Sequence, residues 1–386
     1  MTPSVSPQSG LIVANLLAED EWAGHGSLPS RATRKRLALA AALLAVFARS
    51  DEDTLWLPAP IAPLVARFPV GPSRPAILTV APSAPPSALM AWAATMTIDA
   101  LRPAAPALPG PGTGVDWIDW LWARPVAPAA IARRLASRAW ALAFADRFGD
   151  GLPGARMVRD AADLAAHLAT GAAASSPSGS WVLKACWSAA GRERIIVSAQ
   201  GPSPAQDRWM RRQFARGDAL LFEPWMARRA DFGCVGFADA SGVSLLGTHR
   251  QDIDSRGRFQ GLALWPGCHR PTEMAVEELP RDAAERLEAS ALAVGAALAT
   301  AGYEGPFGVD AWSHTLADGR SAFNAVGEVN VRCTMGLVAR AWVQRLGLAP
   351  DGRAWRLRFG PSPVAATTGI ILAESVGDGA AWLEPC

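Results

Sequence analysis

Apolar and polar positions alternate along the N-terminal part of the chain in a way that predicts short strands and one long helix. Apolar runs at residues 11–16, 54–57 and 76–80 have the length of buried strands. Residues 31–49 lie between the first two runs and contain a long apolar stretch. Ser30 precedes them and is of a type that caps helix N-termini. We therefore expect a buried helix there and a small α/β domain around it.

A segment rich in proline and glycine separates this region from the rest of the chain. Residues 102–114 hold four prolines and three glycines, which is typical of a long loop or a linker. We expect a domain boundary close after it. This gives an N-terminal α/β domain at residues 1–125, a main domain at 126–346 and a short β-rich extension at 347–386.

The main domain continues the mixture of helical and strand patterns. Periodic apolar residues that end at a glycine predict helices, and short apolar runs predict strands. Thr334 can cap a further helix that runs to about residue 346. The expected fold class is therefore α/β. The expected helices are residues 131–148, 160–170 and 282–301, and the expected strands are residues 181–185, 194–198, 355–359 and 369–374.

A hairpin near the end of the main domain carries the clearest chemical pattern. Strand side chains alternate between faces, so Glu328, Asn330 and Arg332 share one face. Asp310 lies on the preceding strand. A three-residue loop at residues 318–320, or a compensating bulge, would place Asp310 opposite Glu328. A two-residue loop would instead send the two acids to opposite faces.

These residue types suit a metal-assisted reaction on phosphate. Two carboxylates beside an amide oxygen are the hard ligands that Mg²⁺ (or Mn²⁺) takes when it bridges nucleotide phosphates. The arginine suits an oxygen of a phosphoryl group or of an acyl phosphate. Taken alone, the motif is equally compatible with an edge hairpin that carries solvated polar residues.

Lysine is rare in this sequence, which draws attention to Lys184. Of the 37 basic residues only Lys35 and Lys184 are lysine, and Lys184 lies in an apolar strand. A buried ammonium requires an anion or a polar partner, and a compact point charge suits a phosphate. The small residues at 187–192, with Ser188 and Gly191 among them, could close over phosphates through their N–H groups. An ordinary hairpin turn beside a solvated lysine is the alternative.

A third segment, residues 220–226, is an apolar strand that runs into a polar turn and then into Asp231. An exposed backbone between apolar walls is what adenine recognition commonly requires. Asp231 follows at a position where a ribose hydroxyl could donate to it. The segment therefore predicts a nucleoside site.

In this order, Lys184 with its small-residue turn, the segment 223–226, Asp310 and the Glu-x-Asn-x-Arg motif resemble the ATP-grasp superfamily. The resemblance covers about residues 131–345 and implies a two-subdomain ATP-grasp fold, with ATP and Mg²⁺ (or Mn²⁺) as cofactors. It also implies a role for each matching residue. Lys184 and Arg138 contact phosphates, Ser188 and Gly191 cover them, Glu223, Trp225 and Met226 form the adenine hinge, Asp231 takes the ribose, Asp310, Glu328 and Asn330 hold the metal, and Arg332 steadies the transferred phosphoryl group.

The resemblance implies activation of a carboxylate by the γ-phosphoryl group of ATP and attack of an amine or another nucleophile on the acyl phosphate. Small-molecule or peptide acids and amines are the expected substrates. Arg250 is a candidate contact to the substrate carboxylate or phosphate, with a solvated hairpin arginine as the alternative. His249 beside it is expected at the surface. A nucleotide-binding sensor without ligase activity and a kinase acting on a hydroxyl are the other functions that the pattern allows.

Composition excludes several other classes of protein. Half of the 386 residues are apolar and 19% are charged, which excludes a disordered chain. The net charge of +2 gives no reason to expect a nucleic-acid partner. The longest apolar run, residues 37–48, is too short to span a bilayer, so no membrane partner is expected. Five widely spaced cysteines fit neither a disulfide framework nor a metal site, so a reducing cytoplasm is the expected location. A homodimer is a possible oligomeric state that the sequence does not decide.

Overall fold

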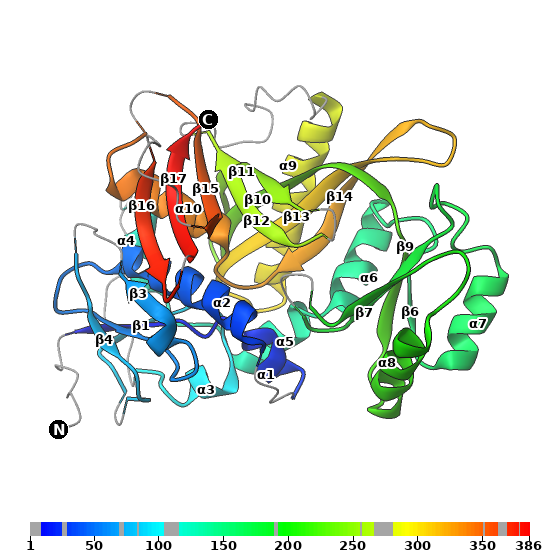
Figure 1. Ribbon diagram of the computed structural model, residues 1–386. Helices are drawn as coiled ribbons and strands as arrows, with labels where there is room; N and C mark the ends of the chain where they lie inside the picture. Colours follow the sequence, from blue (N-terminus) through cyan, green and yellow to red (C-terminus); the bar gives the residue numbers. More distant parts are fainter. Residues whose placement is uncertain are drawn as a thin grey trace.

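The computed structural model describes residues 9–24, 29–68, 73–82, 85–103, 116–188, 192–254, 257–265, 281–349, 352–361, 369–377 and 379–386. Within these residues all the strands, β1 to β17, belong to three sheets, and helices flank them (Figure 1). The expected mixture of helices and strands is confirmed. Among these residues, no helix combines the length and the apolarity that crossing a membrane requires.

The N-terminal region forms a buried parallel sheet with helices around it. Its elements are β1 (Gly10–Val13), α1 (Ala18–Trp22), α2 (Arg31–Leu43), the 3₁₀ helix η1 (Leu44–Phe47), β2 (Thr54–Trp56), the 3₁₀ helix η2 (Ala62–Leu64), β4 (Ala76–Leu78), β5 (Ala88–Ala91), α3 (Met96–Asp99) and α4 (Trp117–Ala123). The strand order is β4-β2-β1-β5, and every residue of β1 is buried, as a strand covered on both faces requires. The Ser30 hydroxyl accepts the Thr33 N–H at 3.2 Å, so the predicted capped helix is confirmed.

The next region forms a small antiparallel sheet with a core of its own. Its elements are α5 (Ala129–Leu135), α6 (Arg138–Phe148), β6 (Arg156–Val158), α7 (Ala161–Ala169), β7 (Trp181–Ala185), β8 (Arg194–Val197), α8 (Pro204–Ala215) and β9 (Leu220–Pro224). The strand order is β6-β9-β7-β8, and Val158, Leu183 and Phe222 are fully buried between the sheet and its helices. The strand pair predicted around Lys184 is confirmed.

The single helix expected over residues 131–148 is two helices, α5 and α6. Ser137 interrupts it, because its hydroxyl accepts the Trp140 N–H at 3.2 Å and caps α6. The backbone N–H of Arg138 then donates to the Cys186 carbonyl at 3.1 Å. The break therefore fixes the start of α6, and with it Arg138, against the end of β7.

The third sheet runs through the middle of the molecule. Its strands and helices are β3 (Val65–Arg67), β10 (Ala227–Asp239), β11 (Gly242–Ile253), β12 (Phe259–Leu264), α9 (Arg281–Thr300), β13 (Gly305–Thr315), β14 (Ser321–Asn330), α10 (Met335–Arg345), β15 (Trp355–Pro361), β16 (Ile370–Ser375) and β17 (Gly379–Pro385). The strand order is β14-β13-β10-β11-β12-β15-β17-β16-β3. The two predicted C-terminal strands are confirmed as β15 and β16. With β17, which the sequence did not predict, they extend this central sheet towards α2 (Figure 1).

Candidate active site

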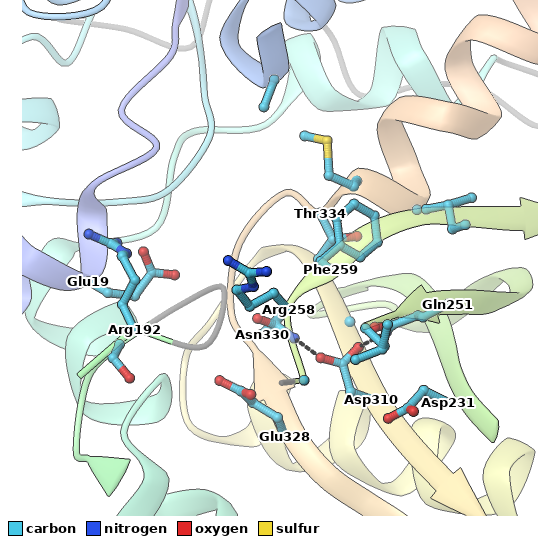
Figure 2. Close-up of a pocket in the computed structure, with 18 of the residues that line it drawn as sticks. Glu19, Arg192, Asp231, Gln251, Arg258, Phe259, Asp310, Glu328, Asn330 and Thr334 are labelled. Carbon is cyan, nitrogen blue, oxygen red and sulfur yellow. Dashed lines mark hydrogen bonds between the residues drawn. The ribbon is translucent and has the colours of Figure 1, made fainter. Parts of the chain in front are cut away.

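A cavity of about 560 Å³ lies where the N-terminal region, the small sheet and the central sheet meet. Its walls come from α1 and α2, from β7 and β8, and from the central strands β10 to β14 (Figure 2). The volume is in the range of small-molecule sites. This cavity collects most of the residues that the sequence motifs singled out.

β13 and β14 bring the two predicted acids face to face. Asp310 pairs directly with Glu328, so the predicted register is confirmed. The Leu316 N–H donates to the Arg320 carbonyl at 2.9 Å, which makes the loop residues 317–319, one residue earlier than expected. A bulge beside Asp310 compensates for this difference.

Asp310 is held by two amide donors and has a raised pKa. It accepts hydrogen bonds from Gln251 Nε2 at 2.6 Å and from Asn330 Nδ2 at 2.9 Å (Figure 2). Burial and the neighbouring charge of Glu328 raise the pKa of Asp310 to about 7. Burial opposes ionisation of Glu328 itself, but the charges of Arg138 and nearby cations lower its pKa overall. Arg138 Nη2 donates to Glu328 at 2.9 Å.

These groups fit a divalent cation that is shared with a ligand. A cation between the two carboxylates would relieve the like-charge contact that raises the pKa of Asp310. Asn330 can offer its amide oxygen if the amide turns. Within the described part of the chain, no cluster of three or more His, Cys, Asp or Glu residues could hold a metal. A cation held by these residues would need further oxygen ligands, and Mg²⁺ sites commonly take them from the phosphates of a bound substrate and from water.

Lys184 faces the same cavity from β7. Its ammonium forms a buried ion pair with Glu223 on β9, and the two side chains are only 8% and 9% exposed. Burial lowers the pKa of Lys184, while the charge of Glu223 opposes this. The predicted anionic partner of the buried ammonium is therefore supplied by the chain itself.

Arg138 connects the acid pair to the loop after β7. Its Nη1 donates to Ser188 Oγ at 2.8 Å, and its Nη2 donates to the Ser188 carbonyl at 3.0 Å. Arg138 is buried and lines the cavity together with Ser188. Gly191, predicted to belong to the covering loop, lies outside the described residues.

Trp312 on β13 forms a flat wall of the cavity. The guanidinium carbon of Arg228 lies 3.7 Å from the centroid of its ring, and Arg228 donates to Asp231 at 2.7 Å. Gly327, which precedes Glu328, packs against the Trp312 ring so closely that a Cβ there would overlap the ring. The glycine of the Gly-Glu-Val-Asn-Val-Arg motif therefore has a packing role.

Gly327→Ala should destabilise the protein by about 1–3 kcal/mol, because the added methyl group must displace Trp312. Urea unfolding measures the change. Gly360→Ala on β15 is the control, since its Cβ would meet Trp382 only at ordinary contact distances of 3.5 Å or more. If Gly327→Ala is as stable as the wild type, the packing assigned to Trp312 is wrong.

Comparisons with known proteins identify the fold. No family model matches the sequence, and no curated protein matches it. The N5-carboxyaminoimidazole synthetase from Staphylococcus aureus in complex with ADP has a TM-score of 0.52 over 100% of this chain and 95% of that chain, at 7% identity. This chain has the ATP-grasp fold. Biotin carboxylase from Campylobacter jejuni has a TM-score of 0.50 over 98% of this chain and 87% of that chain, at 13% sequence identity. Pyruvate carboxylase from Rhizobium etli has a TM-score of 0.51 over 99% of this chain and 36% of that chain, at 15% sequence identity.

The predicted adenine hinge of the ATP-grasp fold lies at the end of β9, but Trp225 is not placed as expected. β7 and β9 stay paired as far as Pro224, and the Trp225 N–H donates to the Ser180 carbonyl at 2.8 Å. This N–H is therefore unavailable to adenine, and the role of Met226 stays a prediction. Glu223, Trp225 and Met226 are not among the described residues that line the cavity, whereas Asp231 is.

The position of Arg250 contradicts the role predicted for it. His249 and Gln251 line the cavity, and strand alternation turns Arg250 to the other face of β11. The surface position expected for His249 is also wrong, since His249 is buried and burial lowers its pKa to about 3. Its ring lies against Gly233 and Gly336, where a Cβ would overlap it.

Arg332 has a partner in the ATP-grasp cavity that the sequence did not reveal. Its Nε donates to Glu19 of α1 at 2.6 Å, across 313 positions of sequence. The neighbouring Asp20 accepts from Arg192 at 2.7 Å. The only signal in the sequence is the run of acids that begins α1, and nothing in it indicates which arginines these acids contact.

Proposed function

We propose that this protein is an ATP- and Mg²⁺-dependent ligase that activates a carboxylate as an acyl phosphate for attack by an amine or another nucleophile. One observation carries the proposal: Asp310 and Glu328 lie opposite each other, beside Asn330, in the same cavity as Lys184. The two acids can bind a divalent cation, and the ammonium can bind phosphate. Because they share one cavity of the size of a small ligand, they suit phosphoryl transfer. A similar structure, the synthetase from Staphylococcus aureus, is complexed with ADP.

The residues would divide the work according to their charge. Lys184 and Arg138 would neutralise the phosphates of ATP and hold them in place. Asp310, Glu328 and Asn330 would hold Mg²⁺, which when bound neutralises charge on the transferred phosphoryl group. Catalysis then rests on positioning two anions that repel each other, with no covalent step on the protein.

An apolar side of the cavity limits which substrates fit. Leu37 and Ala40 reach it from α2, and Phe259 and Phe359 reach it from β12 and β15 with ring centroids 6.0 Å apart. Apolar walls with a few polar groups bind ligands that have one polar end. We therefore expect an acid or an amine that carries an apolar group.

Incubation of the protein with ATP, Mg²⁺ and pooled acids and amines tests the proposal. A ligase will release ADP and phosphate only when an acid is present, and an amide will form when an amine is added. Tight ATP binding without acid-dependent turnover would instead indicate a nucleotide sensor. A stable phosphorylated product that forms without an amine would indicate a kinase.

The raised pKa of Asp310 predicts that metal affinity depends on pH. Below about pH 7 a proton occupies this carboxyl group, and the metal must displace it. The affinity of the nucleotide-free protein for Mn²⁺ should therefore fall by up to about tenfold for each pH unit below 7 and level off above it. Electron paramagnetic resonance of free Mn²⁺ measures the affinity. The Asp310→Asn variant should bind Mn²⁺ more weakly than the wild type, and its affinity should not change with pH. If the affinity of the wild type for Mn²⁺ does not change with pH either, the assignment of Asp310 as a metal ligand is contradicted.

A further inference from the structure

α1 places a buried carboxylate in the cavity with one oxygen unused. Glu19 is 5% exposed and lines the cavity. Its Oε1 accepts from Arg332 Nε at 2.6 Å, whereas its Oε2 is buried and has no hydrogen-bond partner among the described residues. Buried carboxylate oxygens are normally satisfied by donors. An unsatisfied one in a ligand-sized cavity therefore calls for a donor from a ligand.

Arg332 does not explain the second oxygen. Its Nη1 donates to the Cys333 carbonyl at 3.1 Å, and its guanidinium carbon lies 5.1 Å from the centroid of the Trp92 ring. Of the two carboxylate oxygens of Glu19, only Oε1 takes part in this arrangement. A carboxylate kept only to hold Arg332 would leave Oε2 buried at a cost and without a use.

We infer that Glu19 binds the amine of the acceptor substrate through Oε2. The inference rests on the proposed ligase function, in which Arg332 steadies the acyl phosphate. Because Glu19 is bonded to Arg332, an ammonium on Oε2 lies next to the group that will be attacked. Figure 2 shows Glu19 and Asp310 on opposite sides of the cavity, with Asn330 and Glu328 between them.

The chemistry of this step balances without a further reactant. The ammonium first gives one proton to water, and the freed nitrogen lone pair then forms a C–N bond to the carbonyl carbon, while the C–O bond to the phosphoryl group breaks and phosphate leaves with that electron pair. The ammonium loses two protons in becoming the amide nitrogen. One proton goes to the leaving phosphate and the other goes to water, so Glu19 recognises the amine and remains a carboxylate.

Glu19→Gln tests the inference, because it keeps the acceptor for Arg332 but replaces Oε2 with an amide NH₂ group. Two assays are compared, one with hydroxylamine as the nucleophile and one with an amine substrate. Both use an acid that the wild type activates, chosen from a pool of amino acids and of aliphatic and aromatic monocarboxylic acids. Hydroxylamine traps the acyl phosphate as a hydroxamate and does not depend on recognition of the natural amine. We expect hydroxamate formation close to wild type. The KM for the best amine among the proteinogenic amino acids should rise by about tenfold or more.

Two further variants separate recognition from structure. Glu21→Gln on the same helix should leave the amine KM unchanged, since Glu21 accepts from the Thr97 N–H at 2.8 Å outside the cavity. Glu19→Asp keeps a carboxylate and should restore part of the amine affinity. An unchanged amine KM in Glu19→Gln, or a loss of its hydroxamate formation, would overturn this inference alone. If the wild type forms no hydroxamate with any acid, the ligase function itself is overturned.

Discussion

Glu328→Gln should reduce the acid-dependent release of ADP by about a hundredfold to a thousandfold. The amide oxygen can still accept from Arg138, so the fold should persist, but the charge that would hold Mg²⁺ beside Asp310 is removed. A coupled assay of ADP at saturating ATP measures the change. The effect should appear in kcat, because the metal acts on charge that develops during transfer.

The matched control for Glu328→Gln lies at the tip of the same hairpin. Asp318→Asn removes an exposed carboxylate that pairs with Arg320 at 2.7 Å. This exposed pair contributes little to stability, so activity and stability should stay close to wild type. Equal rates for Glu328→Gln and Asp318→Asn would remove Glu328 from the catalytic machinery.

Lys184→Met should destabilise the protein by about 3–5 kcal/mol, because it leaves the Glu223 carboxylate buried without its cation. Glu223→Met should cost a similar amount by stranding the ammonium. The double variant, which leaves neither charge, should recover most of the stability. Urea unfolding of the four proteins gives the coupling between the two residues.

Nucleotide binding separates the two roles of this ion pair. The double variant should fold but bind ATP much more weakly than the wild type, since its phosphate-binding ammonium is gone. Arg211→Met is the control, because its pair with Asp207 is exposed and its loss should change stability by less than about 1 kcal/mol. Wild-type affinity for ATP in the double variant would show that Lys184 has only a structural role.

Local sequence was sufficient for the shared face of a strand and for the Ser30 cap of α2. It did not reveal the Ser137 cap that divides the helix expected over residues 131–148, and Thr334, the expected cap of α10, makes no side-chain cap hydrogen bond. Glu328, Asn330 and Arg332 are two residues apart, so their shared face follows from the strand itself. Glu328 could be placed opposite Asp310 either by a three-residue loop at residues 318–320 or by a bulge. The structure has a loop one residue earlier and a bulge beside Asp310 that compensates for it. The Ser30 cap depends on residues within one helical turn.

Features that depend on distant parts of the chain could not be predicted in this way. The face of Arg250 depends on the register of β11 against β10, where a bulge lies between Val235 and Gly236. The contact between Glu19 and Arg332 joins residues that are 313 positions apart in the sequence. Apolar patterns predicted the C-terminal strands β15 and β16, but not that they extend the central sheet, because strand partners lie far apart in sequence.

The anomalous difference map of crystals soaked with Mn²⁺ and a non-hydrolysable ATP analogue tests the central claim most directly. We predict a Mn²⁺ peak between the carboxylates of Asp310 and Glu328, at about 2.2 Å from their oxygens. The phosphates should lie between this ion and the Lys184 ammonium. A nucleotide bound elsewhere, or a peak that neither carboxylate contacts, would contradict the account.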